Sequence, residues 1–364
     1  MRPQHHPRPL PARRTRLGVL LGAAALVLTA CGGGQSADAP EPAPAPEPAP
    51  APAPAEPEAP ALPPLELVVT TSILGDIVRA IAGDDATVRV LMGPGVDPHG
   101  YAASAADAAA MRDADLVVAN GLLLEEGLVT TLEAAEADGV RVLTLADKVD
   151  PIEFKDAHDD HDHSHSHSHS HDHSHDDHAH DHGDEDPHFW WDPMRMMTAT
   201  ELIGAALAEV RPEVDWADRV AAYNAELADV HDEMVALFAT IPTERRHIIT
   251  NHDSLGYLAD RFDFEVIGTV VPGSTTMAAT NPRDFARLVD LVVAEGVRVI
   301  FAENTDSTVL AEQLRSEAVS RGDVAIEVVR LYTDALGEPG TGAETYLGML
   351  RTSARLITEA LAAA

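Results

Sequence analysis

Four residues of the sequence carry side chains that bind transition metals, and each lies at or just beyond the end of an expected strand. Imidazole and carboxylate are both zinc ligands, and three imidazoles with one carboxylate make a tetrahedral zinc site. Each residue alone has a simpler interpretation, because a polar residue after a strand often caps a turn or faces solvent. The four candidate ligands are His99, His188, His252 and Asp334.

Other titratable residues compete for the same role. Glu303 ends an apolar run and is a rival carboxylate ligand, although a loop residue that accepts hydrogen bonds is the simpler interpretation. His231 falls inside a long helical pattern and His247 at the start of a strand. We therefore expect both histidines to be structural or exposed.

A histidine-rich segment, residues 156–186, precedes His188. It contains almost no apolar side chain, so it cannot pack a core and is predicted to be a solvated loop. Imidazole with nearby carboxylate suits zinc, copper or nickel, although a linker without a metal role would be equally polar. Trp190 and Trp191 follow His188 and should be buried, which would hold its backbone rigid. The auxiliary candidate ligands are His158, His161, His163, His165, His167, His169, His171, His173, His175, His178, His180 and His182.

The first 30 residues are typical of a secretory signal peptide. Several arginines precede the apolar run 17–28, which is too short to span a bilayer comfortably. The run closes on Leu28-Thr29-Ala30-Cys31, which resembles the lipobox of bacterial lipoproteins, where the cysteine is acylated. Cys31 is the one cysteine of the sequence, so an intrachain disulfide is excluded. We predict a lipid anchor at Cys31, followed by a semi-rigid spacer rich in Pro, Ala and Glu.

The rest of the chain alternates between strand and helix patterns. Such alternation calls for parallel sheets covered by helices, and about 300 residues are enough for two compact lobes. We predict an α/β fold in which two (β/α) lobes with parallel sheets are joined by a long helix at 216–237. Ligands of open α/β sheets gather at the carboxyl ends of the strands, so a cleft between the lobes could bring the four candidate ligands together.

The expected elements and domain boundaries follow from these patterns. The expected strands are 65–70, 87–92, 115–119, 140–145, 246–250, 265–271, 297–302 and 325–331. The expected helices are 73–82 capped by Ser72, 107–112, 125–137, 198–210, 216–237, 254–261, 282–295, 308–321 and 344–361. The expected domains are a signal peptide (1–30), a linker (31–64), an N-terminal lobe (65–213), a linking helix (214–240) and a C-terminal lobe (241–364).

Composition narrows the class of partner. The formal net charge is −35 at pH 7, which argues against nucleic acid, while acidic residues beside histidines attract divalent cations. The sequence contains no Gly-rich phosphate-binding loop. Any ATPase that works with this protein must therefore be a separate subunit.

The combined motifs resemble the zinc and manganese solute-binding proteins of bacterial ABC transporters, the cluster A-I family. The resemblance runs from Leu65 to the C-terminus and implies two α/β lobes joined by a rigid helix. It also implies one metal ion bound between the lobes by the four candidate ligands. In that family histidine at the third ligand position is typical of zinc binders, so His252 and the histidine-rich loop indicate zinc. The motifs are Asp97-Pro98-His99-Gly100-Tyr101, Asp186-Pro187-His188-Phe189-Trp190, Asn251-His252-Asp253-Ser254-Leu255-Gly256-Tyr257 and Thr333-Asp334-Ala335-Leu336-Gly337.

These observations predict an extracytoplasmic, lipid-anchored protein that captures Zn²⁺ and delivers it to a membrane ABC permease, with Mn²⁺ the less favoured cargo. A zinc-dependent hydrolase is the alternative from another class, but catalytic zinc needs an open coordination position. Four protein ligands leave little room for water. A surface adhesin or metal buffer would share the same site. We expect a monomer without enzymatic activity that contacts the membrane through its anchor and binds no nucleic acid.

Overall fold

The computed structural model describes residues 62–154, 185–273, 275–322 and 325–363. All of them fall within one compact unit. None of the helices in these ranges is both long and apolar enough to cross a bilayer. Cys31 and residues 155–184, which include the twelve auxiliary histidines, lie outside the described residues, so lipidation and auxiliary binding stay predictions, as do the domain boundaries.

The first half of the fold is a four-stranded parallel sheet in the order β2-β1-β3-β4. The central strands β1 and β3 are almost wholly buried, as expected for a parallel sheet covered on both faces, whereas the edge strand β2 alternates between half-buried and exposed residues. The elements of this half are β1 (Leu65–Val69), α1 (Ser72–Ala82), β2 (Ala86–Val90), α2 (Ala105–Arg112), β3 (Leu116–Ala119), α3 (Val129–Ala137) and β4 (Val142–Thr144).

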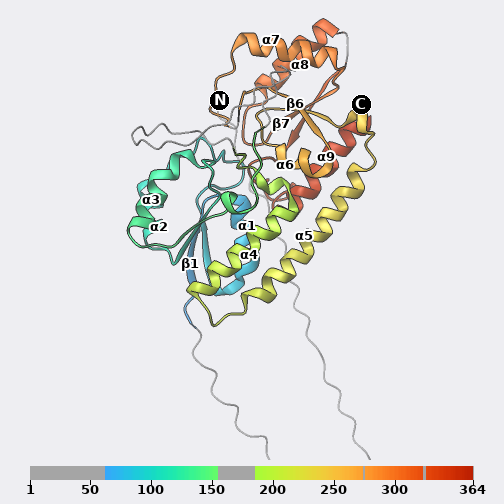
Figure 1. Ribbon diagram of the computed structural model, residues 1–364. Helices are drawn as coiled ribbons and strands as arrows, with labels where there is room; N and C mark the ends of the chain where they lie inside the picture. The colour runs from blue at the N-terminus through green and yellow to red at the C-terminus, as the bar shows by residue number, and fades with distance from the viewer. Residues whose placement is uncertain (1–61, 155–184, 274, 323–324, 364) are drawn as a thin grey trace, which may run out of the picture. The chain divides into compact units, whose positions relative to one another are not determined.

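The second half contains two parallel strand pairs, β5-β6 and β7-β8. The strands β5 and β7 lie next to each other, and α7 and α8 lie together at the outer side of this half (Figure 1). Its elements are β5 (His247–Thr250), α6 (Gly256–Phe262), β6 (Glu265–Thr269), α7 (Pro282–Ala294), β7 (Val299–Glu303), α8 (Val309–Gly322) and β8 (Glu327–Leu331).

Three long helices connect the halves: α4 (Pro193–Val210), α5 (Trp216–Phe238) and α9 (Tyr346–Ala363). The helix α5 packs against α4, α1 and α9 and extends along both halves (Figure 1). At about 1.5 Å per residue its span is on the order of 35 Å. Its buried side chains recur every three or four positions and join a hydrophobic core that contains residues of both halves. The predicted linking helix and α/β fold are therefore present.

Besides shifts of a few residues at several element ends, three details differ from the sequence predictions. The side chain that caps α1 belongs to Thr71, which accepts from the Leu74 amide, and not to Ser72. The helix α4 begins five residues early, because Asp192 caps it and Pro193 occupies its first turn. The helix expected at 125–137 starts as the 3₁₀ turn Glu126–Leu128. A side chain at Gly127 would lie 2.2 Å from the Tyr101 carbonyl oxygen, so this turn packs directly against the loop that carries His99.

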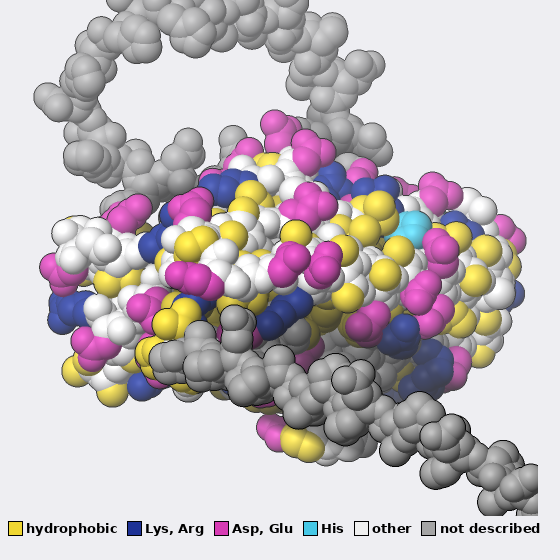
Figure 2. Space-filling view, turned by 90° about the horizontal axis from the view of Figure 1, so that it is seen from below, with side chains coloured by type: hydrophobic (Ala, Val, Ile, Leu, Met, Phe, Trp, Pro, Cys, Tyr) yellow, Lys and Arg dark blue, Asp and Glu magenta, His cyan; other side chains and the backbone are white. Residues whose placement is uncertain are grey.

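The outer surface carries charges of both signs. Seen from below, acidic and basic side chains are interspersed with apolar ones over the described face (Figure 2). Many charged side chains of the described surface form ion pairs, such as Arg351 with Glu233 and Arg355 with Glu359. This face shows no continuous basic patch of the kind that binds nucleic acid.

Candidate metal centre

Three imidazoles meet at the centre of the described structure. The Nε2 atom of His188 lies 3.3 Å from His99 Nε2 and 3.2 Å from His252 Nε2. All three side chains are buried, and ligand atoms of the three lie within 4.8 Å of one another. Two atoms that each lie about 2.0–2.1 Å from a tetrahedral ion are about 3.3–3.4 Å apart. The observed spacing therefore matches the edge of a zinc coordination tetrahedron.

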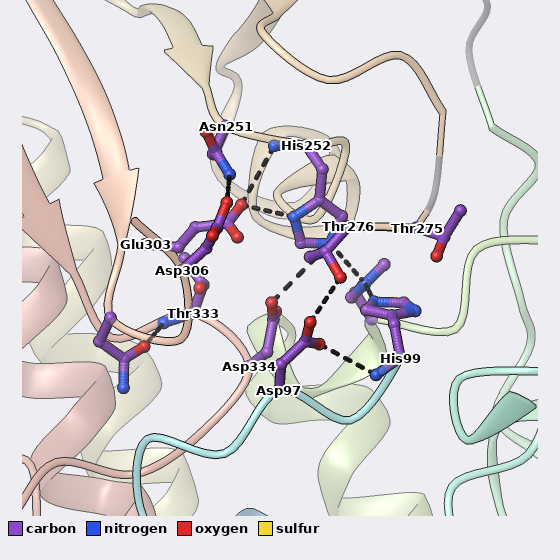
Figure 3. Close-up of polar contacts among 12 residues, drawn as sticks. Asp97, His99, Asn251, His252, Thr275, Thr276, Glu303, Asp306, Thr333 and Asp334 are labelled. Carbon is purple, nitrogen blue, oxygen red and sulfur yellow. Dashed lines mark hydrogen bonds and ion pairs between the residues drawn. The ribbon is translucent and has the colours of Figure 1, made fainter. Parts of the chain in front are cut away.

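Asp334 lies at the same centre, beside His252. Its Oδ2 atom lies 3.8 Å from His252 Nε2 (Figure 3), and its side chain is buried. Both carboxylate oxygens lack a hydrogen-bond partner among the described residues, as does Nδ1 of His99. Buried polar atoms without partners are costly. A cation bound by the carboxylate would remove this cost. The structure brings the four predicted residues together, and their role as ligands remains a proposal.

Each of these residues lies in a loop that the fold places at the centre. His99 lies between β2 and α2, His252 directly follows β5, and Asp334 follows β8. These loops leave the carboxyl ends of parallel strands, where ligands of such sheets gather. His188 comes from the segment before α4, immediately before the 3₁₀ turn Phe189–Trp191.

Three carboxylates hold the histidines in place. Asp186 Oδ1 lies 2.7 Å from His188 Nδ1, and Glu303 Oε1 lies 2.5 Å from His252 Nδ1. Each of these oxygens also accepts the backbone N–H of the same histidine. An ionised carboxylate only accepts hydrogen bonds, so each of these two rings carries a hydrogen on Nδ1 and directs its Nε2 atom at the centre. Asp97 accepts from the backbone N–H of His99 at 3.0 Å.

Glu303 thus occupies the place of a carboxylate that orients a ligand. It belongs to a second group of possible metal-binding residues with His252 and Asp334, but its Oε1 atom is already engaged by two hydrogen bonds from His252. This contact favours the simpler of the two sequence interpretations, a residue that accepts hydrogen bonds.

The protonation of the centre follows from burial and neighbouring charges. Burial and the nearby His188 and His252 lower the pKa of His99 to about 2, and burial also lowers the pKa of His188 well below its ordinary value. Burial disfavours the charged form of His252 too, but Glu303 and Asp334 outweigh it and raise the pKa of His252 to about 10. One proton on His252 therefore lies among three converging nitrogen atoms, where a metal ion would replace it.

Asp334 and Asp186 respond to burial in the opposite sense. Burial raises the pKa of Asp334 well above its ordinary value, against the opposing effect of His252. Burial likewise raises the pKa of Asp186 to about 7, although the His188 amide favours its charged form. Burial thus disfavours the charged form of both carboxyls, and a cation bound at the centre would stabilise that form.

The segment that carries His188 is fixed by neighbours from several elements. Asn120 donates to the Pro187 carbonyl at 2.9 Å, and Trp190 Nε1 donates to the Thr333 carbonyl at 2.7 Å. The Tyr346 hydroxyl donates to the Trp190 carbonyl at 2.6 Å. Trp190 and Trp191 are buried, which confirms the prediction for this aromatic pair.

A loop from the second half reaches across to the first half beside His99. The Thr276 hydroxyl donates to Asp97 Oδ2 at 2.6 Å, while the other oxygen of Asp97 holds the backbone of His99 (Figure 3). Asn251 donates to Asp306 at 2.9 Å, which fixes the loop before His252. The centre is therefore enclosed by side chains from both halves.

Several of these supporting residues were missed by sequence reasoning. Asp186 belongs to the same Asp-Pro-His motif as His188, and this motif was the available signal. For Asn120 the only signal in the sequence was its position at the end of a strand. It lies in a turn in which Gly121, Leu122 and Leu123 have positive φ, and the buried Glu125 accepts from Thr70 and from the backbone at Asn120 and Gly121. Within the described ranges the two other histidines, His231 and His247, are placed as expected, since both are only partly buried and pair with exposed acids.

Known proteins are similar to this chain in sequence and in fold. Residues 67–360 match the family described as ZnuA, zinc-uptake complex component A periplasmic. The zinc-binding protein TroA of Treponema pallidum is 28% identical over 299 residues, which make up 81% of this chain and 89% of that protein. The manganese-binding lipoprotein MntA of Bacillus subtilis is 29% identical over 299 residues, 82% of this chain and 90% of that protein. The solved structure of TroA from Treponema pallidum matches with a TM-score of 0.70 at 26% identity, covering 82% of this chain and 99% of that one. This likeness confirms the predicted two-lobed α/β fold.

Proposed function

Because the chain belongs to the ZnuA family of periplasmic zinc-uptake components, we propose that it captures Zn²⁺ outside the cytoplasm and delivers it to a membrane permease. The chain is a metal-binding, substrate-binding protein of an ABC transporter, and its relatives are binding proteins rather than enzymes. The relatives named above bind either zinc or manganese, so the choice of zinc depends on the centre itself.

The observation that carries the proposal is the spacing of the three imidazoles. The Nε2 atom of His188 lies 3.3 Å from that of His99 and 3.2 Å from that of His252. A tetrahedral ion with short bonds requires such separations between its ligand atoms. Imidazole suits zinc, whereas manganese favours sites built from carboxylate, carbonyl and water oxygens. Three nitrogen ligands and one carboxylate, from His99, His188, His252 and Asp334, support zinc as the cargo.

The partners and location belong to the same proposal. Acylation of Cys31 would hold the protein at the outer face of a membrane, as supported by the lipoprotein name of MntA. A permease and a separate ATPase would complete the transporter. The histidine-rich segment, residues 156–186, would collect zinc near the centre.

A metal competition experiment tests the cargo. The purified protein is freed of metal, exposed to equal free concentrations of zinc and manganese, and analysed by native mass spectrometry. We expect one tightly held zinc ion, with weaker additional zinc equivalents from the histidine-rich segment. Preferential retention of manganese would overturn the assignment of zinc, and retention of neither ion would overturn the function.

A further inference from the structure

Asp192 lies four residues after His188 and forms ion pairs with two arginines. Its Oδ2 atom accepts from Arg195 Nη1 at 2.7 Å and from Arg261 Nη2 at 2.7 Å. Its side chain is fully buried. The other oxygen, Oδ1, accepts the Met194 amide at 2.9 Å and caps α4. We call Asp192, Arg195 and Arg261 the Asp192 cluster.

Arg261 is not needed for the local roles of Asp192. The cap needs only the Met194 amide, and Arg195, one turn along the same helix, already supplies a charge partner for the buried carboxylate. Arg261 instead comes from α6, in the second half, which begins four residues after His252. The Asp192–Arg261 pair therefore joins the segment of one histidine to the helix that follows the other.

A second contact joins the same two elements. The Tyr257 hydroxyl of α6 donates to the Asp186 carbonyl at 2.7 Å. The guanidinium of Arg195 lies over the Tyr257 ring, 5.0 Å from its centre. The segment of His188 is thus tied to α6 on both sides of the histidine, by Tyr257 at Asp186 and by Arg261 at Asp192.

We propose that Arg261, acting through Asp192, is a positioning residue that fixes the spacing of His188 and His252 and so favours zinc over manganese. The inference rests on the proposed function. The chain of contacts closes a ring from His188 to Asp192, across to Arg261, back along α6 to His252, and across 3.2 Å to His188. A fixed separation suits an ion with short bonds in tetrahedral geometry. An ion that prefers octahedral geometry and oxygen ligands gains less from it.

The Arg261→Met variant tests this role in the full chain. It retains the apolar stem of the side chain, and Arg195 still pairs with Asp192, so the protein should fold. Arg261→Lys restores one charged donor. Arg351→Met is the matched control, because Arg351 also joins two helices through a carboxylate, Glu233, at 2.7 and 3.0 Å. Each variant is measured for zinc and manganese affinity, for the visible spectrum of the Co²⁺-loaded protein, and for the melting temperature without metal.

We expect Arg261→Met to weaken zinc binding about tenfold or more, the usual cost of losing a group that orients a ligand. Manganese binding should change less, so the zinc-to-manganese preference falls. The strong visible absorption of tetrahedral Co²⁺ should decrease at saturation. Arg261→Lys should recover part of both effects, and Arg351→Met should leave both unchanged.

Other results would overturn the inference. An unchanged metal preference and Co²⁺ spectrum in Arg261→Met would show that Arg261 does not position the ligands. A lower melting temperature with an unchanged Co²⁺ spectrum would assign it a purely stabilising role. The wild-type protein is titrated with zinc in the same experiment. Tight zinc binding by the wild type shows that these results concern Arg261 alone. Absence of tight binding by the wild type would overturn both the proposed function and the role of Arg261.

Discussion

Oε1 of Glu303 lies 2.5 Å from Nδ1 of His252 and also accepts the backbone N–H of that residue. One carboxylate oxygen thus fixes both the loop and the ring of His252. Because the Nδ1 hydrogen lies toward Glu303, the Nε2 atom is directed at His188, 3.2 Å away. The carboxylate also raises the electron density of the imidazole, which strengthens its bond to a metal ion.

The Glu303→Gln variant should bind zinc about 10–100-fold more weakly, because the amide keeps a hydrogen-bond acceptor but loses the charge. Competition with a chromophoric chelator measures the change. Glu265→Gln is the control, since Glu265 forms an exposed pair with His247 at 3.5 Å and should leave affinity unchanged. Equal affinity of Glu303→Gln and the wild type would show that the contact does not tune the ligand.

Zinc affinity should rise with pH well above the ordinary range of histidine. The pKa of His252 is raised to about 10, so the metal-free protein holds this proton at neutral pH and the ion must displace it. The dissociation constant should fall by about tenfold per pH unit for each proton released. With ordinary imidazoles of pKa about 6.5, affinity would level off near pH 7. Calorimetric titration in buffers of different ionisation enthalpy counts the protons, and a constant affinity between pH 7 and 9 would contradict the prediction.

Replacing any one predicted ligand with alanine should abolish tight zinc binding. We expect a loss of more than about 100-fold for His188→Ala, exceeding the cost of losing an orienting group. The same holds for His99, His252 and Asp334. His231→Ala and His247→Ala are the controls, because both rings are partly exposed and pair with exposed acids. The measurement uses protein without residues 156–182, and full affinity of His188→Ala would disprove its role as a ligand.

The order of elements could be predicted from the sequence because β1, β3 and β7 consist mainly of apolar residues and α5 repeats its apolar side chains at helical spacing. Element ends were harder to predict. The start of α4 was missed because Asp192-Pro193, directly after the turn Phe189–Trp191, looks like a loop. Its role as a helix start depends on Asp192 accepting the Met194 amide, a contact that only the folded chain shows.

His99, His252 and Asp334 could be predicted because their motifs follow strands, and His188 because it belongs to an Asp-Pro-His motif, but the residues that support them could not. Arg261 and Asp192 are 69 residues apart, and Asn120 and Pro187 are 67 apart. No local pattern connects such pairs, since the contacts form only in the folded chain. The sequence likewise left open the role of Glu303, because a carboxylate at a strand end can bind a metal or accept hydrogen bonds.

Asp107 should stabilise the loop that leads from His99. It accepts hydrogen bonds from Ser104, Tyr101 and Arg89, and the Ser104 contacts are the main cause of the fall of its pKa to about 2. Asp107→Asn should therefore lower the free energy of unfolding by about 1–2 kcal/mol at pH 7.

The pH dependence of this effect has a definite sign. The folded pKa of Asp107 is below the ordinary value of 3.8, so its stabilisation is present above about pH 4 and is lost as pH falls toward about 2. Urea unfolding from pH 7 to pH 3 should show the gap between variant and wild type narrowing. Asp138→Asn, at the exposed pair with Arg112 near the other end of α2, is the control. Equal stability of Asp107→Asn and the wild type at pH 7 would refute the prediction.

Removing residues 156–182 should leave the principal centre intact. The flanking residues Glu153 and Glu185 pair directly as an antiparallel bridge, and the Asp186 amide donates to the Ile152 carbonyl at 2.8 Å. A short turn can therefore replace the segment without moving His188. Tethered so close to the centre, its imidazoles have a local concentration in about the mM range.

The deletion should remove the weaker zinc equivalents and slow loading when zinc is scarce, while the affinity of the tight site stays the same. A variant of unchanged length, with the histidines of the segment replaced by serine, separates metal binding from spacing and should behave like the deletion. Calorimetry gives the stoichiometry and stopped-flow competition gives the loading rate. Unchanged stoichiometry and rate in both variants would show that the segment is a spacer, and loss of tight binding would place the principal site within it.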